Sequence, residues 1–145
     1  MSMYGQLGLG FSADSFEPGY GMIRSRVNEP TEITMPSNVR VVQIHCGAMF
    51  TLFLSEEDEL YGCGINDLGQ LGLDTYLEEM QVAAMERARQ SAGVRKIVTS
   101  DVTVPSRVIC FENMKVSSLA CGENHSLALV GEDKSLWAWG MFKNG

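Results

Sequence analysis

Long apolar runs are absent from this sequence of 145 residues, because Gly and polar residues interrupt every apolar stretch. A membrane-spanning helix needs about 20 apolar residues in a row, so no segment qualifies. The first residues do not lead into the basic and apolar regions of a secretory signal. We therefore expect an intracellular protein, cytoplasmic or nuclear, without a membrane partner.

Positive charge is scarce, since the chain has 11 Lys and Arg residues but 18 Asp and Glu residues, which gives a net charge of -7. Proteins that bind nucleic acids normally carry a basic surface that neutralises phosphates. The arginines near residues 24–26 and 87–95 have no interleaved aromatic residues, so solvated charge explains them better than a phosphate site. The charge disfavours nucleic acid as a partner.

Motifs of common enzymes and cofactor sites are also lacking. The sequence has no Gly-rich phosphate loop followed by Lys, no Gly-x-Ser-x-Gly elbow and no paired-His metal motif. His45 and His125 are the only histidines, and both lie in or beside strand patterns, where a structural role is the better interpretation. We expect no catalytic residue and no cofactor.

The four cysteines, Cys46, Cys63, Cys110 and Cys121, show none of the Cys-x-x-Cys spacing of zinc or redox sites. In a reducing compartment we expect them to stay unpaired. Cys46 and Cys121, with the two histidines, could supply four metal ligands. They come from two different parts of the sequence, however, so neutral core residues are the better interpretation.

What the sequence does contain is a repeat. Three pairs of segments correspond: residues 5–9 with 69–73, 41–54 with 116–129, and 60–64 with 136–140. The first pair is Gly-Gln-Leu-Gly-Leu in both copies. A period of this length, longer than a hairpin and shorter than a domain, is typical of a propeller blade or a solenoid unit.

Each unit contains short strand patterns, rich in β-branched, aromatic and Leu residues and separated by turn signals. They cover residues 39–46, 49–54 and 59–63 in the first unit, and 115–121, 125–130 and 135–139 in the second. A proline-led extended segment precedes each unit, at residues 30–35 and 105–109, and edge strands tolerate such a proline. We expect four antiparallel strands in each unit, with the proline-led strand outermost.

Alternation of large apolar residues on these strands predicts the core. A period of two places such residues on one face of a strand, and the repeat suggests that this face is buried in both units. We expect the principal buried anchors to include Leu52, Leu54, Leu127, Leu129, Trp137 and Trp139.

Two inserts, residues 11–28 and 74–101, separate these patterns. The second predicts a helix near residues 75–92, because Thr75 and Glu78 form a capping box and apolar residues recur at helical spacing. We expect this helix to pack on the edge of a blade, and the alternative is that it awaits a partner.

The predicted fold is therefore all-β: a partial β-propeller of about two four-stranded antiparallel blades, with one helical insert near residues 75–92. The chain is interpreted as a single incomplete propeller segment over residues 1–145. Its blade units are expected at about residues 30–73 and 105–145.

Residues 121–129, Cys-Gly-Glu-Asn-His-Ser-Leu-Ala-Leu, are followed by Leu-Trp-Ala-Trp-Gly at 136–140, and the loop 64–72 ends in Gly-Gln-Leu-Gly. These residues resemble the regulator of chromosome condensation repeat family, over about two units. The resemblance implies blades of a seven-bladed propeller. Phe50 and Cys63 stand where the family pattern has His and Trp.

The resemblance implies several functions, since the family includes interaction platforms, ubiquitin-ligase subunits and a guanine-nucleotide exchange factor for a small GTPase. Fold alone does not choose among them. We expect a non-enzymatic protein-interaction scaffold. The alternative is a fragment of a guanine-nucleotide exchange factor, and a chromatin-binding module is the third interpretation.

Two polar loops are the candidate protein contacts, Glu56, Glu57 and Asp58 in one and Asn66 and Asp67 in the other. Their acidic groups could compete for the phosphate-binding lysine of a small GTPase, although solvated turn residues are the simpler interpretation. Because two blades leave strand edges and apolar faces uncovered, we expect a protein partner or additional blades, from another chain or from a parent protein. Head-to-tail self-association is one such arrangement.

Overall fold

The computed structural model describes residues 4–10, 16–17, 21–22, 27–73 and 101–141. Nine strands and two short 3-10 helices lie there: β1 (Phe16–Glu17), β2 (Gly21–Met22), η1 (Pro36–Asn38), β3 (Val41–Cys46), β4 (Phe50–Ser55), β5 (Leu60–Gly64), β6 (Val102–Arg107), η2 (Ile109–Phe111), β7 (Val116–Cys121), β8 (His125–Val130) and β9 (Ser135–Gly140). The helix expected near residues 75–92 lies outside this part of the chain. In the described part, no helix has the length and apolar character needed to cross a bilayer.

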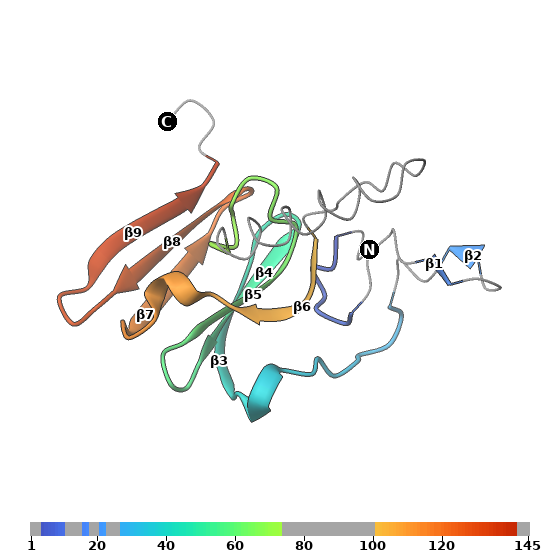
Figure 1. Ribbon diagram of the computed structural model, residues 1–145, viewed down its shortest axis with the longest axis horizontal. Coiled ribbons are helices and arrows are strands. Elements are labelled where there is room, and N and C mark those ends of the chain that lie inside the picture. Colours follow the sequence, from blue (N-terminus) through green and yellow to red (C-terminus); the bar gives the residue numbers. More distant parts are fainter. Residues whose placement is uncertain (1–3, 11–15, 18–20, 23–26, 74–100, 142–145) are drawn as a thin grey trace, which may run out of the picture.

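Two antiparallel sheets dominate the structure (Figure 1): a four-stranded sheet in the order β3-β4-β5-β6 and a three-stranded sheet in the order β7-β8-β9. Their pairings repeat, because Cys46 faces Thr51 in the first sheet as Cys121 faces Ser126 in the second. A register shift also recurs near the start of both β3 and β7. The prediction of two antiparallel repeat units in an all-β fold is confirmed.

The prediction that each proline-led segment joins the sheet of the unit that follows it is wrong. Pro105 lies in β6, which pairs with β5, so that Tyr61 faces Arg107. β6 is therefore the outer strand of the four-stranded sheet, and the second sheet has three strands among the described residues. Residues 30–35 form no strand. A local pattern marks an extended segment, but the open edge with which it pairs is a non-local property.

A core of buried apolar side chains lies between the two sheets. It comprises Phe50, Leu52, Leu54, Leu60, Leu71, Leu73, Val102, Val108, Phe111, Val116, Leu119, Ala128 and Val130. Burial of Leu52 and Leu54 confirms two of the predicted anchors. We call this region the shared core, since both sheets contribute to it.

Three of the other predicted anchors are wrong. Leu127 and Leu129 are only half-buried, and Trp137 is 45% exposed, whereas Trp139 is partly buried against the shared core. On β8 the buried side chains are instead Ser126, Ala128 and Val130, which alternate with the two leucines. Alternation identifies the two faces of a strand, but the packing of the sheets decides which face turns inward.

A smaller cluster covers the other face of the four-stranded sheet. Phe53, Tyr61 and Cys63 are buried there, and Ile33, Met35, Val39 and Val41 pack against them. Residues 33–39 therefore cover this sheet without joining it as a strand.

The second Gly-Gln-Leu-Gly turn connects the two sheets. The carbonyl oxygen of Gln70 accepts hydrogen bonds from Ser126 Oγ and Trp139 Nε1, both at 2.9 Å. The corresponding bonds of the first turn, at 2.9 and 3.5 Å, join the Gln6 carbonyl to Thr51 Oγ1 and Cys63 Sγ. Each turn is thus attached to the second and third strands of a repeat unit. The hydrogen bond from Cys63 to Gln6 corresponds to the one from Trp139 to Gln70, but it is longer.

Candidate functional site

The acidic candidate loop is the turn between β4 and β5, and backbone contacts hold it on both sides. Glu56 forms an ion pair with Arg40, and its N–H donates to the Arg40 carbonyl at 2.8 Å. Asp58 has a φ of 61°, and its carbonyl accepts a hydrogen bond from the Val116 N–H at 3.2 Å. The turn is therefore tied to the three-stranded sheet, while Glu57 remains exposed.

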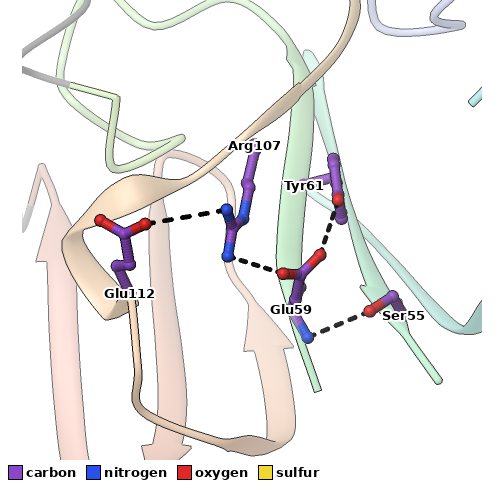
Figure 2. Close-up of polar contacts among 5 residues, drawn as sticks. All are labelled: Ser55, Glu59, Tyr61, Arg107 and Glu112. Carbon is purple, nitrogen blue, oxygen red and sulfur yellow. Dashed lines mark hydrogen bonds and ion pairs between the residues drawn. The ribbon is translucent and has the colours of Figure 1, made fainter. Parts of the chain in front are cut away.

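Figure 2 shows a polar network beside this turn, with Glu59 at its centre. The Glu59 carboxylate accepts a hydrogen bond from the Tyr61 hydroxyl at 2.8 Å and pairs with Arg107 at 2.6 Å. Its N–H donates to Ser55 Oγ at 3.1 Å, and Arg107 also lies 3.9 Å from Glu112. The network links β5 to β6 and to the segment after η2. The sequence interpretation did not identify Arg107 or Tyr61, because their pairing depends on β6 joining β5.

The Tyr61 hydroxyl is expected to make stability depend on alkaline pH. Burial and the hydrogen bond to Glu59 raise the pKa of Tyr61 from 10.0 to about 12. Because the folded protein holds this proton more tightly than the unfolded chain does, the contribution is complete below pH 10.0 and is lost as pH rises to about 12. Glu59→Gln should lower this pKa, since it removes a negative charge. An ultraviolet titration of tyrosinate, with Tyr61→Phe for subtraction, measures it; an unchanged pKa in Glu59→Gln would contradict the assignment.

A groove of about 730 Å³ lies between this network and η1, and Pro36, Asn38, Glu57, Tyr61 and Pro105 are among its lining residues. Its walls combine apolar rings with the Glu57 carboxylate and the ion pair of Glu59 and Arg107. Such a surface can contact an apolar side chain and a cationic group of a partner protein. Of the residues predicted to contact a partner, Glu57 is the one that lines this groove, and its carboxylate is exposed.

The second candidate loop lies at the opposite end of β5 from the acidic turn. Asn66 is 1% exposed, and its Oδ1 accepts a hydrogen bond from the Leu71 N–H at 2.8 Å. Asp67 is exposed, and its Oδ1 accepts from Gln70 Nε2 at 3.3 Å. The structure therefore does not bring the two candidate loops together, and the burial of Asn66 gives it a role in shaping the turn. A contact through Asp67 stays a prediction.

The histidines and cysteines do not assemble a metal centre in the described part of the chain, where no three metal-ligating side chains gather. A Cβ atom on Gly122 would collide with the His125 ring, and one on Gly47 would collide with the Phe50 ring. His125 and Phe50 thus fill the same space over a glycine in the two units. Burial also raises the pKa of Cys63 to about 12, which suppresses its thiolate and so its reactivity.

Large apolar side chains on the outer surfaces are a further feature that the sequence interpretation did not single out. Leu136 on β9 is 70% exposed, and Ile44 on β3 is 61% exposed. The repeat alignment alone does not reveal this exposure, because Leu136 aligns with Leu60 and Ile44 with Leu119, both of which are buried.

The family model of the regulator of chromosome condensation (RCC1) repeat matches residues 1–54 and 57–129 of the chain. A second model of the same repeat matches residues 41–70 and 116–145. These matches cover both repeat units, and the two spans of the second model correspond to the segments that the sequence comparison aligned.

Curated relatives agree with this assignment. The probable E3 ubiquitin-protein ligase HERC4 of Homo sapiens is 30% identical over 98% of this chain and 15% of its own length. The ultraviolet-B receptor UVR8 of Arabidopsis thaliana is 29% identical over 98% of the chain and 24% of its own length. The chain thus spans about a quarter or less of these relatives.

A solved structure supports the fold. The crystal structure of Prp20p from Saccharomyces cerevisiae superposes with a TM-score of 0.61 at 24% identity, covering 97% of this chain and 27% of Prp20p. The two antiparallel sheets correspond to propeller blades in this comparison. The chain belongs to the regulator of chromosome condensation (RCC1) repeat family, and its sheets are blades of a β-propeller.

Proposed function

We propose that this chain is a non-enzymatic, intracellular protein-interaction scaffold, and that the acidic turn between β4 and β5 is one of its contact surfaces. The observation that carries the proposal is an exposed carboxylate, Glu57, on a turn that its neighbours hold in place. A fixed loop binds with a smaller loss of conformational entropy than a flexible one.

The charge of the turn favours a partner with a basic surface. Glu57 and Asp58 stand beside the Glu59 network, and the chain carries a net charge of -7. Complementary charge mainly accelerates association and selects the partner. The structural relative Prp20p was characterised together with its binding to Gsp1p and histones. Those two proteins are therefore the first probes for this chain.

A fragment of a guanine-nucleotide exchange factor is the second candidate function, since an acidic turn can compete for a lysine that binds phosphate. The two functions differ in one measurement, the release of labelled GDP from Gsp1p. A scaffold binds without accelerating this release, whereas an exchange factor accelerates it. Accelerated release would overturn the scaffold proposal.

Charge reversal at Glu57 tests the contact surface. We expect Glu57→Lys to slow association with a basic partner several-fold and to weaken its salt dependence, because the turn attracts that partner electrostatically. Biolayer interferometry with Gsp1p and with histones, at two salt concentrations, measures both effects. Glu132→Lys, in the corresponding turn between β8 and β9, is the matched control. Equal effects of the two variants, or no effect of Glu57→Lys, would contradict the proposed surface.

A further inference from the structure

A pocket of about 300 Å³ lies beside the acidic turn and is lined by residues of both repeat units. The first unit contributes residues 57–60, and the second contributes residues 111–115, which run from η2 to β7. Residues 107 and 108, at the end of β6, complete the lining. We call it the inter-unit pocket. Its volume is at the lower end of the range of about 300–1,000 Å³ that is typical of ligand pockets, so it suits one side chain of a partner.

Apolar side chains form one part of the lining. Leu60, Val108 and Phe111 belong to the shared core and are buried, whereas Met114 is 37% exposed. The pocket therefore extends from solvent, at Met114, to the surface of the shared core. It offers apolar surface to the stem of an entering side chain.

The charged part of the lining is mainly acidic. It has four carboxylates and two cations, which gives a net charge of -2: Glu57, Asp58, Glu59 and Glu112 against Arg107 and Lys115. Figure 2 shows Arg107 between Glu59 and Glu112, with which it forms ion pairs. The ion pairs among the residues that the structure describes do not include Glu57 or Asp58. These two carboxylates are therefore the ones that can receive a cation from outside.

Backbone hydrogen bonds hold the walls of the pocket in place. The Val108 N–H donates to the Leu60 carbonyl at 2.8 Å, and the Val116 N–H donates to the Asp58 carbonyl at 3.2 Å. The Met114 N–H donates to the Phe111 carbonyl at 2.9 Å. A pocket that is formed before its ligand arrives loses little conformational entropy on binding.

Apolar walls beside unpaired carboxylates match a long basic side chain. The methylene groups of such a side chain pack on apolar surface while its charged head stays near solvent and acidic groups. Arginine fits better than lysine, because its planar guanidinium can donate to two carboxylates at once and is less strongly hydrated. We propose that the inter-unit pocket binds one arginine side chain of a partner protein, and that Glu57 and Asp58 receive its guanidinium.

This inference rests on the proposed scaffold function, and it names the residue of the partner that the acidic turn selects. An acidic surface attracts any positive charge, whatever the length of the side chain that carries it. The pocket requires the charge and the apolar stem together. This difference allows the two proposals to be tested separately.

Three short peptides that differ in one side chain provide the first test. The reference is acetyl-Gly-Ser-Arg-Ser-Gly-amide. Citrulline in place of arginine keeps the shape without the charge, and 2-amino-3-guanidinopropionic acid keeps the guanidinium but shortens the stem. We expect each replacement to raise the dissociation constant at least about 10-fold, because one removes charged hydrogen bonds and the other removes buried methylene groups. Proton–nitrogen NMR titration of the full chain, followed at the amides of residues 112–115, measures all three. Equal affinity of the reference and either replacement overturns the inference.

Two substitutions in the pocket provide the second test. Met114→Trp should fill the pocket without changing its charge, and Asp58→Asn removes one carboxylate while Asn still tolerates the positive φ of 61°. We expect each to weaken binding of the reference peptide at least about 5-fold. Met49→Trp, at a position that is 41% exposed and outside the pocket, is the matched control for Met114→Trp and should leave the affinity unchanged. A well-dispersed NMR spectrum shows that each variant is folded. Unchanged affinity in both pocket variants contradicts the inference.

Failure of the pocket and failure of the scaffold proposal give different results. If Met114→Trp leaves peptide binding unchanged while Glu57→Lys still slows association with Gsp1p or histones, the pocket inference is overturned and the contact surface stands. If the reference peptide binds in the pocket but Glu57→Lys has no effect on either protein, the pocket stands and the proposed contact surface is overturned.

Discussion

Gly64→Ala is expected to destabilise the protein by more than about 3 kcal/mol, the largest effect of any single methyl group that the described structure suggests. Gly64 has a φ of 113°, which strains any residue with a side chain. A Cβ atom there would lie 2.5 Å from the Cα of Phe50 and would also collide with the Met49 carbonyl. Both obstacles are backbone atoms at the start of β4, so relief requires β4 and β5 to separate.

Gly10→Ala is the matched control for this prediction. Gly10 also has a positive φ, 83°, but its added Cβ would meet only Val104 Cγ1, at 3.8 Å. We expect Gly10→Ala to lower the free energy of unfolding by about 1 kcal/mol, because only the backbone conformation is strained. Urea denaturation followed by circular dichroism measures both variants. Similar losses would show that the clash with β4 is relieved without separating the strands.

Leu52→Ala is expected to lower the free energy of unfolding by about 2–5 kcal/mol, because it opens a cavity in the shared core. Leu52 is 0% exposed and lies between the two sheets. Its repeat counterpart Leu127, which is only partly buried, should lose less, about 1–2 kcal/mol, on the same substitution. Two leucines with equivalent positions in the repeat thus differ through their surroundings alone.

Chemical denaturation at protein concentrations low enough to keep the chain monomeric measures this pair. Equal losses in the dilute monomer would contradict the different packing of the two faces.

The strands of the two units could be predicted because their signals are local. Period-two patterns and repeated glycines mark β3 to β5 and β7 to β9, and the alignment of the units predicted that Cys46 and Cys121 would occupy equivalent places. The partner of Pro105 could not be predicted in this way. β6 pairs with a strand that precedes it by a long insert, and nothing in residues 102–107 records that partner.

In the candidate site, too, the local features could be predicted from the sequence and the non-local ones could not. Glu56, Glu57 and Asp58 could be predicted as a turn, because a short polar connection between two strand patterns is a local signal. The ion pair between Glu59 and Arg107 depends on β6 and could not. Asn66 was expected in a contact loop, but its amide oxygen binds the Leu71 N–H, which turns the side chain into the fold. Polarity alone does not distinguish a turn-forming Asn from an exposed one.

Strand β6 reaches β5 only after the chain has passed through residues 65–101. The entropy lost in closing a flexible loop grows with the logarithm of its length, about 0.6 kcal/mol for each doubling. We therefore expect an insertion after residue 73, beyond the turn that contacts the second sheet, to change the stability of the four-stranded sheet very little. During synthesis, the same connection leaves β5 as an open edge until residue 107 has left the ribosome, so the nascent chain carries an unpaired edge strand throughout the synthesis of this connection.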